Sequence, residues 1–210
     1  DEAHKFGKHA AAHCASTQGI LNALDAGVDT VIHGYHRDPD GGFQYQPKVA
    51  ERMAERGVFL NPTLNAGRRR IRVLEDKLES EGLTEAEQAE LNETRQAHDV
   101  RFDHVSRMIA AGVKLTCGSD SAWGVYEMGD FQGEVDAHVE AGLSPMEAIV
   151  SATGDSARSC WIDGDVGTIA EGKQADLLVV DGDPTQDIGA LNNVVDVFQT
   201  GTRVDRGNYV

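Results

Sequence analysis

Cysteine, proline and aromatic residues are scarce in this sequence, and long apolar runs are missing. The three cysteines, Cys14, Cys117 and Cys160, are an odd and scattered set that does not form a disulfide framework. A reducing cytoplasm is therefore the expected setting. No stretch of about 18 apolar residues occurs, which argues against a transmembrane helix. The polar opening at residues 1–5 also lacks the apolar core of a signal peptide.

Positive charge is in short supply as well. Lysine and arginine total 19 against 35 aspartate and glutamate residues, which gives a formal net charge of -16. Nucleic acid is not an expected partner, because phosphate contacts need a basic face, and an anionic membrane surface is disfavoured for the same reason. A small-molecule substrate and a second copy of the chain, forming a homo-oligomer, remain open as partners.

Short apolar runs alternate with helical patterns over the first two thirds of the chain, which is typical of parallel β/α units. The expected strands are 8–14, 28–33, 58–62 and 113–117. The expected helices are 16–26, 47–57, two within the charged segment 67–111, and one that opens at Ser144-Pro145-Met146-Glu147. In that last motif serine caps the helix, proline suits its first turn, and the glutamate reaches back to the cap.

After about residue 163 the pattern changes to strands and turns without a helix, at 176–181, 194–200 and a hairpin end at 201–204. The sequence therefore predicts an α/β part, 1–163, and a β part, 164–210. A β/α unit takes about 30 residues and a complete eight-unit barrel about 250, whereas the first part holds four units. It is either a smaller open sheet or half of a barrel whose other half is absent.

Three side chains of metal-ligand type stand at the carboxyl ends of predicted parallel strands: His13, His33 and Asp120. Functional sites of parallel α/β proteins form at this edge. Two imidazoles and a carboxylate suit a divalent metal such as zinc. Any one of them alone is more often a packed residue, a solvated residue or a turn former. All three at the same edge of successive units are much less expected by chance, and they predict a metal site.

Several motifs carry a specific resemblance. They are Ala-Ala-His13-Cys, Val-Ile-His33-Gly, Cys-Gly-Ser-Asp120-Ser, the segment Ala-Thr-Gly-Asp-Ser-Ala-Arg at 152–158, and the tail Gly-Thr-Ile-Ala-Glu-Gly-Lys-Gln-Ala-Asp-Leu-Leu-Val-Val-Asp-Gly-Asp-Pro at 167–184. Together these motifs resemble the amidohydrolase superfamily, nearest to its imidazolonepropionase-like and prolidase-like branch. The resemblance covers nearly the whole chain except 68–94.

The resemblance implies a fold and a place for each ligand. The fold would be the last four β/α units of a TIM (β/α) barrel, followed by the C-terminal strands of a small β-sandwich. His13 and His33 match the metal-binding histidines of the family's fifth and sixth strands, and Asp120 matches the eighth-strand aspartate, which binds metal and shuttles protons. The family's H-x-H pair and bridging lysine or glutamate would lie upstream. The chain is therefore expected to be a C-terminal fragment that is inactive alone.

The resemblance also implies a reaction for the complete protein. One or two divalent ions, with zinc expected, would activate water for attack on a carbon–nitrogen bond in a cyclic amide, an imidazolone or a dipeptide. Asp120 would accept the proton of that water and pass it to the leaving nitrogen, and His33 would help to polarise the carbonyl oxygen. The substrate, the metal and the oligomeric state are not determined by the sequence.

Further residues near these strand ends are candidates for substrate contact. Tyr35 and His36 follow His33, Asn61 ends the third strand, and Trp123 follows Asp120. For Tyr35 and His36 a solvated loop is about equally expected, and for Trp123 core packing is. The arginines at 68–70 and at 72 would suit a substrate carboxylate, although a solvated helix face is favoured.

Two other functions stay open at this stage. One is a non-catalytic homologue that keeps the amidohydrolase fold as a scaffold or assembly module, which the absence of H-x-H from the chain permits. The other is a flavodoxin-like domain. That fold would need a glycine-rich phosphate loop after a first strand, and the sequence contains none.

Overall fold

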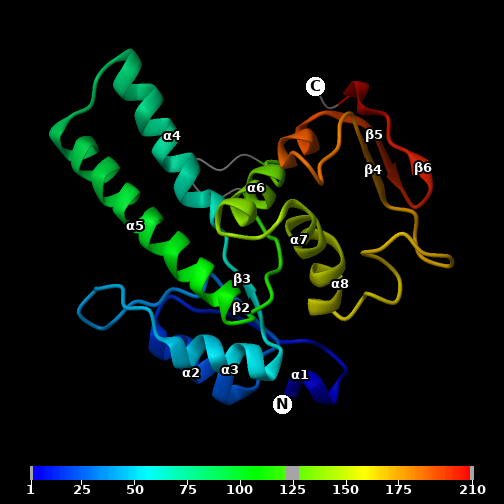
Figure 1. Ribbon diagram of the computed structural model, residues 1–210, viewed down its shortest axis with the longest axis horizontal. Coiled ribbons are helices and arrows are strands. Elements are labelled where there is room, and N and C mark those ends of the chain that lie inside the picture. Colours follow the sequence, from blue (N-terminus) through cyan, green and yellow to red (C-terminus); the bar gives the residue numbers. More distant parts are fainter. Residues whose placement is uncertain (1, 122–127, 209–210) are drawn as a thin grey trace.

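Three short parallel strands form the centre of the α/β part. The computed structural model describes residues 2–121 and 128–208, and Figure 1 shows its elements. Strands β1 (Ala11–His13), β2 (Thr30–Ile32) and β3 (Phe59–Asn61) pair in the order β1-β2-β3. The register places His13 opposite Ile32 and Ile32 opposite Asn61. All three strands therefore end at the same edge of the sheet, as the sequence predicts, although each is shorter than expected.

The fourth predicted strand, 113–117, is reduced to a single parallel bridge between Leu115 and Leu60. Two hydrogen bonds hold it, from Leu60 N–H to the Lys114 carbonyl at 2.9 Å and from Thr116 N–H to the Leu60 carbonyl at 2.8 Å. The prediction of a full strand is therefore wrong in length. The segment still runs beside β3 and delivers residues 118–120 to the shared edge.

Helices connect and cover the strands. They are α1 (Glu2–Lys5), α2 (Thr17–Ala26), α3 (Pro47–Arg56), α4 (Asn65–Ser80), α5 (Glu85–Ala110), α6 (Gln132–Glu140), α7 (Pro145–Val150) and α8 (Ser156–Ser159), with a π-helix, η1 (Ser151–Asp155), between the last two. Helices α4 and α5 form the long antiparallel hairpin at the left of Figure 1. Within the described residues, no helix is long and apolar enough to cross a membrane.

Helix ends follow the expected capping chemistry. The Ser16 hydroxyl accepts the Gly19 N–H at the start of α2. Capping boxes begin α5, with Thr84 and Glu87, and α7, with Ser144 and Glu147. Each box satisfies amides that the first turn leaves without a partner.

The main core lies between the parallel sheet and the helices α2, α3 and α5. Its largest side chains without solvent exposure are Ile20, Leu24, Met53, Leu60 and Met108. The apolar residues of α2 and α3 recur at helical spacing, so one face of each helix reaches this core. The core therefore holds the parallel sheet against these helices.

Leu60, in the middle of β3, provides a direct test of this packing. Its side chain is 0 % exposed and belongs to the main core. We expect Leu60→Ala to lower the free energy of unfolding by about 2–5 kcal/mol, because it removes buried methyl groups and leaves a cavity. Leu78→Ala, on α4, serves as the control, since Leu78 is 44 % exposed, and its effect should stay within about 0.5 kcal/mol. Equal urea midpoints for the two variants would contradict this packing.

The C-terminal part is a separate antiparallel sheet. Strands β4 (Leu177–Val180), β5 (Val194–Gln199) and β6 (Thr202–Arg203) pair in sequence order. Two short 3-10 helices, η2 (Ile188–Asn192) and η3 (Arg206–Asn208), correct the expectation of a tail without helix. Ile188 of η2 packs with Val135 of α6 and Ala148 of α7 in a second small core. The tail is thereby joined to the α/β part.

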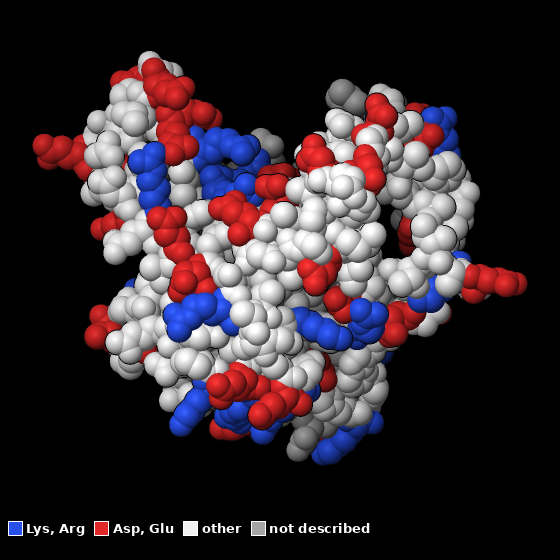
Figure 2. All heavy atoms as spheres, viewed as in Figure 1, with Lys and Arg blue, Asp and Glu red and all other residues white. Residues whose placement is uncertain are grey.

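The arginine-rich start of α4 is engaged in ion pairs. Arg68 contacts Asp136 at 2.7 Å, Arg69 contacts Asp130 at 2.8 Å, and Arg70 contacts Glu90 at 2.6 Å. These pairs tie α4 to α5, to α6 and to the residues just before α6. Figure 2 shows the basic side chains on the inner side of the hairpin and acidic ones over its tip. These ion pairs within the protein account for the three arginines better than binding of a substrate carboxylate or exposure on a solvated helix face.

Candidate functional site

Two histidines meet at the carboxyl edge of the parallel sheet. His13 is the last residue of β1, and His33 follows β2 directly. Their ring centroids lie 4.5 Å apart at an interplanar angle of 75°. The strand register produces this contact, because neighbouring parallel strands end side by side. The two imidazoles are therefore close enough to act on one small ligand or ion.

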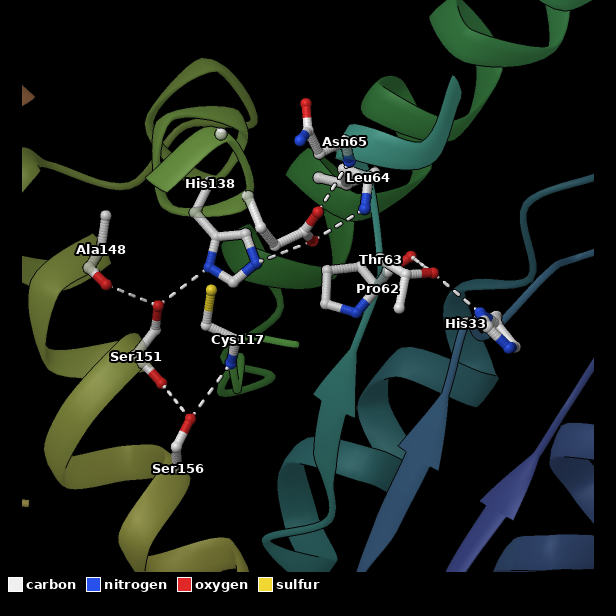
Figure 3. Close-up of polar contacts among 12 residues, drawn as sticks. His33, Pro62, Thr63, Leu64, Asn65, Cys117, His138, Ala148, Ser151 and Ser156 are labelled. Carbon is white, nitrogen blue, oxygen red and sulfur yellow. Dashed lines mark hydrogen bonds and ion pairs between the residues drawn. The ribbon is translucent and has the colours of Figure 1, made fainter. Parts of the chain in front are cut away.

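The hydrogen bonds around His33 define which ring nitrogen carries the proton. The Nδ1 atom lies 2.7 Å from the Thr63 hydroxyl, and that hydroxyl donates its proton to the Pro62 carbonyl at 2.8 Å (Figure 3). A hydroxyl has a single proton, so Thr63 accepts from Nδ1–H. The neutral ring then keeps its lone pair on Nε2. This is the form in which histidine binds a metal.

The charge environment keeps His33 in that neutral form. Burial lowers the pKa of His33 first, and the nearby His13 and Arg101 lower it further, whereas Asp120 acts in the opposite direction. Burial disfavours the charged imidazolium, because the ring loses hydration. A His33 pKa below its usual 6.5 leaves the ring uncharged at neutral pH. Asp120 is thus the one negatively charged group among these influences on His33.

Backbone strain gathers at the same edge. Among the described residues, five other than glycine have a positive φ, and three of these are His33 (63°), Thr63 (49°) and Asp120 (51°). This conformation is unfavourable for most side chains and especially for a β-branched residue such as Thr63. Strained residues persist where the surrounding structure holds them, and they cluster at functional sites.

Asn61 lies beneath the loop that leads to Asp120. A Cβ atom at Gly118 would stand 2.3 Å from the Asn61 Nδ2 atom, so only glycine allows this close approach. The buried Asn61 Oδ1 has no hydrogen-bond partner within the described part of the chain. Asn61 thus supports the edge and retains one unused acceptor.

The donor set matches part of a metal site and not a whole one. Within residues 2–121 and 128–208, no group of three or more His, Cys, Asp or Glu side chains is arranged to hold a metal ion. His33 nevertheless presents a lone pair on Nε2, with His13 beside it and Asp120 near. Imidazole and carboxylate are the ligands that zinc accepts. These residues fit a divalent ion as a partial ligand set that needs ligands from elsewhere.

Tyr35 lies next to His33 at this edge. Its ring centroid is 6.0 Å from that of His33, and the Arg101 guanidinium stacks 4.0 Å over it. Arg101 also donates to the Tyr35 hydroxyl at 2.9 Å and to the Pro62 carbonyl. A pocket of about 340 Å³ opens beside them, between α4 and α5, with Leu64 and Phe102 among its lining residues. Arg101 comes from α5 and was not among the sequence candidates.

His36 lies in the core and not at the mouth of the site. It is 1 % exposed, stacks on Tyr45 with centroids 5.1 Å apart, and contacts the ring of His104. Its Nδ1 accepts the Gln46 N–H at 3.1 Å. This burial favours the packing role over substrate contact. Trp123, the remaining substrate candidate, lies outside the described residues.

The burial of His36 predicts a pH dependence of stability. Burial, with His104 and Arg107 adding to it, lowers the pKa of His36 to about 4. The unfolded chain binds this proton near pH 6.5, so stability is complete above that value and falls as the pH drops toward 4. The loss amounts to about 3 kcal/mol. In His36→Phe, the urea-derived stability should change less steeply between pH 6.5 and 4. An unchanged slope would contradict this assignment.

A buried polar network behind the edge was not predicted. Glu134 and His138 of α6, both without solvent exposure, connect the start of α4 with η1, and Figure 3 shows the contacts. Their spacing of four residues places both side chains on one helix face. That spacing was the available signal in the sequence. Residues 132–140 carry no strong apolar period, so this helix was not assigned.

Comparisons with known proteins agree on one family. A model of the amidohydrolase family matches residues 1–204. The chain resembles a Xaa-Pro dipeptidase with bound methionine, at 29 % identity and a TM-score of 0.75, covering 97 % of this chain and 46 % of that one. It also resembles a putative prolidase from Bifidobacterium longum, at 27 % identity and a TM-score of 0.76, covering 97 % and 48 %.

A third solved structure is a prolidase complexed with N-methylphosphonate-L-proline. The identity is 28 % and the TM-score 0.71, and the match covers 98 % of this chain and 47 % of that one. The chain thus spans about half the length of the structures it matches. No curated protein matches it.

Proposed function

The chain belongs to the amidohydrolase family, and from that premise we propose that it is the C-terminal half of a metal-dependent hydrolase of carbon–nitrogen bonds. Its parallel strands would be the last units of a (β/α) barrel, and β4 to β6 would belong to a small β-sandwich. Residues preceding this chain would supply the other strands and ligands. The match to about half of each related structure supports this division.

The observation that carries the proposal is the state of His33. Its Nδ1–H is engaged by Thr63, which leaves the lone pair on Nε2, and the ring lies beside that of His13. For a histidine that only packs in a core, neither the positive φ nor the fixed tautomer of His33 would be required. A metal-ligating histidine needs both its orientation and its tautomer to be fixed by an outer hydrogen bond. We therefore assign His13, His33 and Asp120 to one or two zinc ions.

Each residue then has a chemical task. A bound divalent ion supplies Lewis acidity, which acidifies water and polarises a carbonyl group. Asp120, exposed at the edge, accepts the proton of the attacking water and returns it to the leaving nitrogen. His33 and His13 would hold the ion through their ring nitrogens. Tyr35 and Asn61 border the space where the substrate would lie, and Asn61 retains an unused acceptor.

Dipeptides are the substrate class favoured among those considered. The resemblance to prolidases and to a Xaa-Pro dipeptidase supports this choice. The complete protein should hydrolyse Xaa-Pro dipeptides, lose this activity on dialysis against a chelator, and regain it when Zn²⁺ is added. Release of proline, measured by chromatography, provides the readout. Activity that survives complete metal removal would contradict the proposal.

A second candidate is a non-catalytic scaffold with the same fold. The observation that favours it is the lack, among the described residues, of a complete group of metal-ligating side chains. The complete protein would then contain no stoichiometric metal and would not turn over any dipeptide. Elemental analysis of the purified complete protein separates the two functions.

A further inference from the structure

A buried carboxylate from a different helix caps the start of α4. Glu134 of α6 is 0 % exposed, and its two oxygens accept the Leu64 and Asn65 N–H groups, each at 2.7 Å. Residue Leu64, at the N-cap position, has an apolar side chain and cannot serve as a cap. The first amides of a helix need an acceptor, and a buried carboxylate needs donors. Glu134 satisfies both requirements at once.

This cap adjoins the residue that orients His33. Thr63 directly precedes Leu64 and has a φ of 49°, which is unfavourable for a β-branched residue. Its hydroxyl oxygen accepts a hydrogen bond from His33 Nδ1–H at 2.7 Å. The two amides bound to Glu134 fix the backbone that follows Thr63. An unbroken series of contacts therefore runs from the carboxylate through the start of α4 to the imidazole ring (Figure 3).

The same carboxylate leads to the Asp120 side of the edge. His138 Nε2 lies 3.4 Å from Glu134, and His138 Nδ1 lies 2.8 Å from the Ser151 hydroxyl. Ser151 donates to the Ala148 carbonyl, so His138 Nδ1–H is the donor to Ser151. Ser151 begins the π-helix η1, a turn that contains one more residue than a turn of α-helix.

The last link connects η1, through Ser156 at the start of α8, with the segment before Asp120. The Ser156 hydroxyl donates to the Ser151 carbonyl at 2.7 Å and accepts the Cys117 N–H at 3.2 Å. Cys117 stands three residues before Asp120. These contacts run from His138 to the segment before Asp120, whereas His138 Nε2 makes no hydrogen bond to Glu134 or to any other described residue. Glu134 and His138 have no solvent exposure, so any action of these residues on the site is indirect.

We propose that Glu134 is a positioning residue for the metal site, which acts through the cap on α4 to hold Thr63 and thereby the ring of His33. This inference rests on the proposed function, because it gives His33 the role of a ligand. Outer-shell partners of metal-ligating histidines typically change metal affinity by about 10- to 100-fold when they are removed. A carboxylate that only stabilised the fold would change the unfolding midpoint and leave metal affinity intact.

A double-mutant cycle on the complete protein separates these roles. The variants are Glu134→Gln, Thr63→Ala and both together, and the readout is Zn²⁺ affinity by competition with a chelator. Each single variant should weaken binding about 10- to 100-fold. The double variant should be no weaker than the worse single one, because both changes release the same ring. Independent, multiplying losses would overturn the inference.

Matched controls complete the design. Glu147→Gln removes a carboxylate that caps α7 by accepting the Ser144 N–H, and it should leave Zn²⁺ affinity unchanged. Thr63→Ser keeps the hydroxyl and should retain affinity. The visible spectrum of the Co²⁺-substituted protein should change in Glu134→Gln and not in Glu147→Gln. If Glu134→Gln does not fold, Glu134→Asp replaces it, because the shorter acid keeps its charge and cannot span both amides.

The outcomes distinguish this inference from the proposed function. A wild-type complete protein that binds no divalent metal contradicts both. If the wild type binds Zn²⁺ and Thr63→Ala weakens binding, while Glu134→Gln or its Asp replacement binds as tightly as wild type, the proposed function stands and the positioning role is rejected.

Discussion

Replacing Asp120 with asparagine is expected to lower the turnover of the complete protein by about 10²- to 10⁴-fold, the usual contribution of a general acid–base group. Asparagine has nearly the same shape as aspartate and cannot accept the proton of the attacking water. The side chain is exposed at the edge of the sheet, and the backbone holds a φ of 51° there. Asparagine tolerates this conformation better than most residues, so the fold should survive the change.

A matched control isolates the chemistry from the loss of charge. Asp99→Asn removes a carboxylate from α5 whose side chain is 84 % exposed, and it should leave turnover unchanged. The measurement is the steady-state rate on a Xaa-Pro dipeptide with saturating Zn²⁺. Normal turnover in Asp120→Asn would show that another group moves the proton.

Replacing His33 with asparagine is expected to weaken Zn²⁺ binding by about 100-fold or more, beyond the effect of losing an outer-shell partner. The substitution removes the Nε2 lone pair of a ring that donates from Nδ1 to Thr63 and lies beside His13. Asparagine is also suited to the positive φ at this position. Activity should fall with metal occupancy and recover in part at high Zn²⁺ concentration.

His9→Asn provides the comparison for His33. His9 is exposed and lies four residues before His13, so its replacement removes an imidazole without removing a proposed ligand. Zn²⁺ affinity, measured by chelator competition, should match that of the wild type. Equal losses for His9→Asn and His33→Asn would mean that metal binding does not depend on the edge of the sheet.

The sequence allowed the outline of this edge to be predicted. The parallel strands and their common end follow from apolar runs that alternate with helices, and the polar residues that close those runs are His13, His33 and Asp120. Local signals such as Ser16 and the Ser144 capping box also located helix starts correctly. These features depend on short stretches of chain, and for that reason periodicity and capping chemistry reveal them.

The support behind the edge could not be predicted in this way. Glu134 acts on amides about 70 residues earlier, and Arg101 reaches Tyr35 from another helix. Such contacts form only when the helices pack, and no pattern in a short stretch of sequence predicts them. The segment 113–117 was expected to be a full strand from its apolar residues, yet only Leu115 pairs with β3. Beyond this bridge the chain passes close to Asn61 at Gly118.

The most direct measurement is a crystal structure of the complete protein with Zn²⁺, with anomalous diffraction recorded at the zinc absorption edge. The account predicts an anomalous peak about 2.0–2.1 Å from His33 Nε2, with His13 and Asp120 around the same ion or pair of ions and Thr63 still bound to Nδ1. A zinc-loaded protein whose peak lies away from these three side chains, or whose His33 ring turns its Nε2 from the ion, would contradict it.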